Sequence, residues 1–145
     1  MPIKSFRGQV DDGDIITVPL STKTGSKGYR IVKFQCMLAG FENAEMVIKV
    51  YTIPQTTTSH TVDFNDPTLL AAALISGSDS AEANPEDQTI IFDNMVFNQD
   101  IYITGDKNST ATLVNWHIEL EEVKLDLNDN TLATLKDIRN INSQV

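Results

Sequence analysis

The sequence has little of the chemistry that covalent catalysis or tight metal binding requires. Cys36 is the only cysteine among 145 residues, which excludes an intrachain disulfide and a thiolate metal cluster. The two histidines, His60 and His117, lie far apart in the chain, and no serine lies in a strained Gly-x-Ser-x-Gly turn. The seven glycines are scattered singly, so no glycine-rich loop is present to cradle a phosphate. The sequence therefore predicts a protein that is not an enzyme, with no catalytic residue and no cofactor.

Basic charge and long apolar runs are also scarce. The chain carries 11 Lys and Arg residues against 20 Asp and Glu residues, a net charge of −9 at pH 7. Nucleic acids and anionic membranes are recognised largely through Lys and Arg, so neither is expected as a partner. No apolar run approaches the roughly 20 residues of a membrane-spanning helix, and residues 1–8 lack the apolar stretch of a signal peptide. We expect a protein that stays in the cytoplasm or leaves it without a cleaved signal.

What the sequence has instead is a series of short segments with the period of two that is typical of strands. In one of them, even-numbered residues from Val32 to Leu38 share a face, and Ile31 lies on the other. An Asp-rich turn at residues 11–14 opens the first segment. Strands are predicted at residues 15–18, 29–38, 46–53, 89–92, 99–104 and 111–120.

The clearest strand pattern is that of residues 111–120. Its apolar and polar side chains alternate, as in an antiparallel strand with one face toward water or a partner. After Glu121 and Glu122 the apolar residues move to odd-numbered positions, so a β-bulge is expected there. The apolar face is Val114, Trp116, Ile118 and Leu120, and the polar face is Asn115, His117, Glu119 and Glu121.

Two segments have capping residues and apolar spacing that predict helices. Asp66 is placed to cap a helix that begins at Pro67 and ends at Gly77, with Leu70 and Leu74 on one face. A second short helix, or an arm that follows a curved surface, is predicted after Asn128 or Asn130.

Together these segments predict an all-β protein. The expected fold is an antiparallel β-sandwich over residues 1–127, with a jelly roll as one topology open to it and one short inserted helix. Residues 128–145 are expected to form a short C-terminal helix or arm of the same single domain. The pattern does not separate a sandwich from a barrel.

Two patterns are similar to metal sites. His117 and Glu119 project side by side from one strand, and His60 would complete a two-histidine, one-carboxylate set if the fold brought it near. A solvated strand face produces the same alternation, and we predict no metal there. Residues 126–130 imitate the opening of a calcium-binding loop, and the turn at 11–14 holds three aspartates. Asp-rich turns are common for conformational reasons alone, so calcium is left as an alternative.

The aromatic residues offer an alternative function. Trp116 lies on the apolar face of its strand, where core packing is expected, and Cys36 is expected to act as a small apolar residue. Tyr29, Tyr51 and Tyr102 are candidates for exposed rings on which a sugar could stack. The alternative is therefore a carbohydrate-binding β-sandwich module.

Several stretches of the chain resemble small virion-associated structural proteins of marine tailed bacteriophages of the podovirus or cyanophage type. The stretches are residues 1–8, 92–94, 97–102 and 126–140, the last including Thr134-Leu135-Lys136-Asp137-Ile138-Arg139. None of these stretches is a chemical signature, and no functional residue is carried over from that family.

The resemblance implies a structural component of a phage particle, most naturally a capsid decoration or cement protein that binds the assembled head. Its partners would be the major capsid protein or other virion proteins, and a homo-oligomer, with a trimer favoured, would be expected. It would be found in the virion, and in the host cytoplasm during assembly. A tail or head-tail accessory protein is the alternative within this class.

The predicted contact surface is the C-terminal segment. Its apolar side chains either bury against a neighbour or pack against the sandwich of the same chain, and the sequence leaves both open. The predicted interface residues are Leu132, Leu135, Lys136, Ile138 and Arg139.

Overall fold

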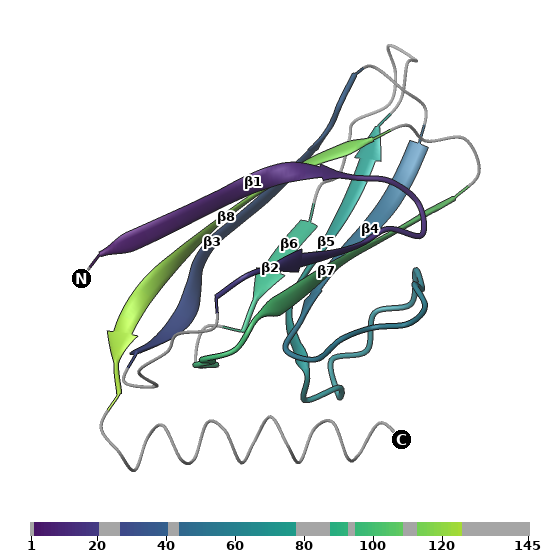
Figure 1. The fold of residues 1–145 in the computed structure, drawn as a ribbon. Coiled ribbons are helices and arrows are strands. Elements are labelled where there is room, and N and C mark those ends of the chain that lie inside the picture. The colour runs from purple at the N-terminus through teal and green to yellow at the C-terminus, as the bar shows by residue number, and fades with distance from the viewer. Residues whose placement is uncertain are drawn as a thin grey trace.

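The computed structural model describes residues 2–20, 27–40, 44–77, 88–92, 95–108 and 113–125. This part of the chain is all-β, and its strands form two antiparallel sheets that pack face to face as a β-sandwich (Figure 1). The predicted fold class is confirmed. The strands are β1 Ile3–Val10, β2 Ile15–Val18, β3 Lys27–Leu38, β4 Ala44–Tyr51, β5 Leu69–Gly77, β6 Gln88–Ile91, β7 Ile101–Asn108 and β8 Val114–Lys124.

The smaller sheet has the order β1-β8-β3, and the larger has the order β2-β7-β4-β5-β6. Pairing of β1 with β8, β2 with β7 and β4 with β5 nests the chain as a jelly roll does. The fold departs from that topology at β6, which pairs with β5 at the edge of the larger sheet. The chain passes from one sheet to the other between β1 and β2, through a turn in which Gly13 has a φ of 79°.

One core lies between the sheets, and β8 contributes its centre. The predicted apolar face of β8 is buried throughout, because β8 is the middle strand of its sheet and its inner face meets the larger sheet. The main core side chains are Val114, Trp116, Ile118 and Leu120 of β8, Met46, Ile48 and Val50 of β4, and Ile101 and Ile103 of β7.

The prediction of a β-bulge in β8 after Glu121 and Glu122 is wrong, and a bulge lies instead in the neighbouring strand β3. The register of β8 against β3 is continuous through Glu121 and Glu122, and it shifts between Ile31 and Lys33. Val32 is the extra residue and is 40% exposed, whereas Ile31 and Phe34 both lie in the core. The prediction that Val32 and Phe34 share a face is therefore wrong.

The predicted helix from Pro67 to Gly77 is also wrong, because Leu69–Gly77 is strand β5. Its Leu and Ala residues favour a helix in an isolated peptide. In the fold, the segment pairs with β4 along one edge and with β6 along the other. Most of β5 is buried on both faces, so the alternation that marks a strand is missing. The predicted C-terminal helix or arm, residues 128–145, lies outside the described residues.

Candidate functional site

Residues 52–68, the strap, connect β4 to β5 and cover part of the outer face of the larger sheet. Its two ends meet where the Thr52 amide donates to the Thr68 carbonyl at 2.9 Å. Alternate strand residues face opposite sides, so burial of Lys49 and Tyr51 on the outer face of β4 requires a cover. The strap provides that cover.

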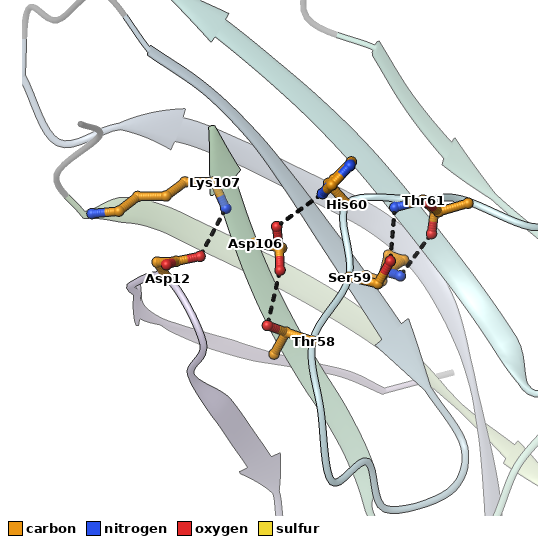
Figure 2. A network of polar contacts seen from close by, with 8 residues as sticks. Asp12, Thr58, Ser59, His60, Thr61, Asp106 and Lys107 are labelled. Carbon is orange, nitrogen blue, oxygen red and sulfur yellow. Dashed lines mark hydrogen bonds and ion pairs between the residues drawn. The ribbon is translucent and has the colours of Figure 1, made fainter. Parts of the chain in front are cut away.

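Asp106 of β7 anchors the middle of the strap (Figure 2). Its carboxylate accepts a hydrogen bond from the Thr58 hydroxyl at 3.0 Å, and its other oxygen lies 3.3 Å from Nδ1 of His60. Within the strap, the Thr61 amide donates to the Ser59 hydroxyl at 3.1 Å. These contacts fix residues 58–61 over β7, so the polar contacts of Asp106 hold the strap against the sheet.

Lys49 of β4 forms a second contact that holds the strap against the sheet. Only 4% of the residue is exposed, and its ammonium group donates to the Thr61 carbonyl at 2.8 Å and lies 5.6 Å from the centre of the Tyr51 ring. Burial lowers the pKa of Lys49, and the charges of Asp106 and Asp66 oppose that change. A buried ammonium that is hydrogen-bonded and faces carboxylates can remain charged and hold the strap in place.

Tyr51→Phe is expected to reduce the loss of stability at high pH. Burial, helped by the charges of Asp66 and Asp63, raises the pKa of Tyr51 to about 12 from 10.0. Between these values the unfolded chain releases the phenolic proton and the folded chain keeps it, so the free energy of unfolding falls as the pH rises. This proton accounts for at most roughly 2 to 3 kcal/mol.

The check on this prediction is urea unfolding of wild type and Tyr51→Phe at about pH 8 and about pH 11.5. Lys49 acts in the opposite direction, because its lowered pKa makes stability rise as the pH approaches 10.5. Tyr102→Phe is the control: its pKa is also raised by burial, but the residue is less buried, so its effect should be smaller. Equal alkaline losses in wild type and Tyr51→Phe would contradict the assignment.

The residues of the hypothetical metal site do not come together. His117 and Glu119 lie on the outer face of the smaller sheet, whereas His60 lies beside Asp106 on the larger sheet. Among the described residues, no group of three or more His, Cys, Asp or Glu side chains is placed to hold a metal ion. The calcium-like loop, residues 126–130, lies outside the described residues.

The Asp-rich turn at residues 11–14 uses its carboxylates to hold its own backbone. Asp11 accepts from the Asp12 amide at 2.7 Å, and Asp14 accepts from the Asp11 amide at 2.9 Å. Asp12 accepts from the Lys107 amide at 3.0 Å, which ties the turn to β7 (Figure 2). Each of these contacts is made to a backbone amide, so the conformation of the turn explains why these aspartates are present.

The burial of the aromatic residues differs in part from the prediction. Trp116 lies in the core as expected, and Cys36 is partly buried against the core. Tyr29 and Tyr51 are buried, at 1% and 8% exposure, so the prediction of exposed rings is wrong for both. Tyr102 is half-buried. A sugar platform made of these three rings is therefore not available.

An apolar patch that the sequence did not reveal lies where the strap meets the edge of the larger sheet. Its members are Val62 and Phe64 of the strap, Leu74 of β5 and Ile90 of β6, all between 38% and 59% exposed. They line a groove of about 400 Å³, and the Phe64 ring contacts Phe92 edge-on, with ring centres 5.3 Å apart. Only the fold brings these residues together, because the strap must cross two strands to reach β6.

No family model matches the chain, and no curated protein matches it. In the part of the chain that the structure describes, no helix has the length and apolar character that crossing a membrane requires. The predicted interface residues Leu132, Leu135, Lys136, Ile138 and Arg139 lie outside the described residues.

Proposed function

We propose that this chain is a structural protein of a tailed-phage particle, a decoration protein that binds the assembled head through the apolar patch. The observation that carries the proposal is the gathering of Val62, Phe64, Leu74 and Ile90 on one exposed surface. Exposed apolar patches on soluble proteins commonly mark protein interfaces. The sequence resemblance to virion-associated proteins supports the choice of partner.

The placement of the patch also supports an assembly role. In the described part of the chain, β6 is the last strand of the larger sheet and lies beside the patch. A partner could contact the side chains of the patch and the backbone of this edge together. The strap presents its two patch residues in a fixed position, because Lys49 holds the Thr61 carbonyl next to Val62. A surface held in place in advance loses less entropy on binding.

The proposal is tested by sedimenting the purified chain with isolated heads and, separately, isolated tails of a podovirus-type cyanophage. Saturable binding to heads supports a decoration protein, and binding to tails alone indicates the tail accessory alternative. Binding to neither overturns a virion role for the chain. Light scattering on the free chain gives its oligomeric state, and a trimer would have about three times the 16.0 kDa mass of one chain.

The double variant Leu74→Thr, Ile90→Thr is expected to bind heads at least about tenfold more weakly than wild type. Threonine has the β-branched shape that strands favour, but it removes most of the apolar surface. Ile3→Thr on β1 is the matched control, because Ile3 is similarly exposed, at 52%, but lies on the other sheet. Unchanged binding by a folded double variant would contradict the role of the patch.

A further inference from the structure

We propose that the outer face of the smaller sheet is a binding site for a saccharide that carries a carboxylate, such as a uronic acid unit. This face lies on the opposite side of the sandwich from the apolar patch, and the proposal does not depend on the proposed function. The site consists of Arg7 and Gln9 of β1, Gln35 and Met37 of β3, and Asn115 and His117 of β8.

The strand register explains how these six residues meet. Arg7, His117 and Gln35 form one row across the three strands, and Gln9, Asn115 and Met37 form the next row. Alternate residues of each strand share a face, so all six side chains project from the outer surface. The residues between them, Gly8, Trp116 and Cys36, also line the hollow, which has a volume of about 790 Å³. This volume is in the range of small-molecule sites.

Within the described part of the chain, the polar side chains in the two rows that line the hollow have no partner. Among the described residues, Arg7, Gln9, Gln35, Asn115 and His117 have no side-chain hydrogen bond or ion pair. The other arginine of the same face is satisfied differently: Arg30 donates to one Glu121 oxygen from two nitrogens, at 2.7 and 3.0 Å. Arg7 therefore keeps its donors available for a ligand.

The charge of the hollow differs from that of the whole molecule. The chain has 20 acidic residues and a net charge of −9, yet among the described residues that line the hollow none is Asp or Glu, and Arg7 is one of them. An arginine can donate two parallel hydrogen bonds to a carboxylate, and such charge-assisted bonds are stronger than neutral ones. The hollow is thus suited to one negative group on an otherwise uncharged ligand.

The remaining side chains match a sugar ring. Gln9, Gln35 and Asn115 each offer a carbonyl acceptor and amide donors, the pair that neighbouring hydroxyl groups require. Met37 is 64% exposed and offers a soft apolar surface for the C–H face of a ring. The strands hold these groups in fixed rows, so little ordering is needed when the ligand binds.

The test uses oligomers of galacturonic, glucuronic and mannuronic acid, and N-acetylneuraminic acid, measured against the intact chain by calorimetry and ligand-observed NMR. The methyl ester of each acid keeps the hydroxyl groups and removes the charge, and acetate supplies a carboxylate without a sugar. We expect one acid to bind saturably, its ester to bind more weakly, and acetate not to compete. No binding by any acid, equal binding of acid and ester, or full competition by acetate would overturn the proposal.

Variants locate the site on this face. Arg7→Met keeps the stem of the side chain and removes its donors, so binding of the acid should weaken by about 10-fold to 100-fold. Gln35→Ala should weaken both the acid and its ester. Arg30→Met is the matched control, because that arginine lies on the same sheet face but is paired with Glu121. An equal loss in Arg30→Met and Arg7→Met would contradict the site, because it would indicate a general charge effect.

Discussion

Trp116→Ala is expected to lower the free energy of unfolding by about 3 to 5 kcal/mol, the range for removing a buried aromatic side chain from a core. Trp116 is the only tryptophan, is 6% exposed and lies on the middle strand of the smaller sheet. Its ring lies against Gly8 of β1, where a Cβ would come within 2.9 Å of a ring carbon. Because β1 and β3 flank this position, the cavity cannot close without moving a whole strand.

Trp116→Phe separates the packing of the ring from its polar group. The Nε1 of Trp116 is buried and has no hydrogen-bond partner among the described residues, so the indole carries a desolvation cost that phenylalanine lacks. We expect Trp116→Phe to cost less than half as much as Trp116→Ala. Urea unfolding followed by far-ultraviolet circular dichroism measures all three proteins, since the tryptophan signal is lost in both variants. A loss below about 1 kcal/mol in Trp116→Ala would show that the ring is not a main core contact.

Whether the sequence pattern predicted a strand correctly depended on whether one face of that strand meets water. The alternation of β8 predicted its buried face correctly, because its other face is partly open to solvent. The alternation failed for β5, where the strap covers the outer face and a helix-favouring run of Leu and Ala becomes a strand. The bulge at Val32 was missed, because residues 32–38 alternate regularly in the sequence, and the change of parity after Glu121 and Glu122 does not correspond to a bulge in β8.

The surfaces were harder to predict than the core. Lys49 and Thr61 are 12 residues apart, and His60 and Asp106 are 46 apart, so no local pattern indicates that the strap returns to the sheet. The hollow of the smaller sheet was partly within reach, because the polar face of β8 was predicted. Arg7 and Gln35 lie beside this face only because of the register of the three strands, which the sequence does not show.

The two proposed surfaces are compatible because they face opposite ways. In a sandwich the inner faces of the sheets meet, so the outer face of the larger sheet points away from that of the smaller sheet (Figure 1). A chain attached to a particle through the apolar patch on β5 and β6 would turn the hollow on β1, β8 and β3 toward solvent. Head binding and saccharide binding should therefore be independent of each other.

Gly105→Val is expected to be as damaging as the loss of Trp116, although valine ordinarily favours strands. Gly105 lies on β7, and a Cβ there would come within 2.6 Å of the Met46 Cε atom, 2.8 Å of Val10 Cγ2 and 3.0 Å of the Asp11 carbonyl oxygen. The methionine end can move at little cost, but the other two contacts belong to a buried core residue and to backbone. Gly105→Ala should cost about 1 to 3 kcal/mol and Gly105→Val more.

The cost is large because Gly105 is bonded to the link between β1 and β2, one of the connections between the two sheets. Its amide donates to the Asp14 carbonyl at 3.3 Å, and its carbonyl accepts from the Gly13 amide at 2.9 Å, so the link between β1 and β2 is bonded to β7. A side chain at this position would push the link away and break both bonds. Gly40→Ala is the control, because nothing lies within 4 Å of a Cβ there. If urea unfolding shows Gly105→Val to be as stable as Gly40→Ala, the link does not pack against β7 as closely as the contacts of Gly105 require.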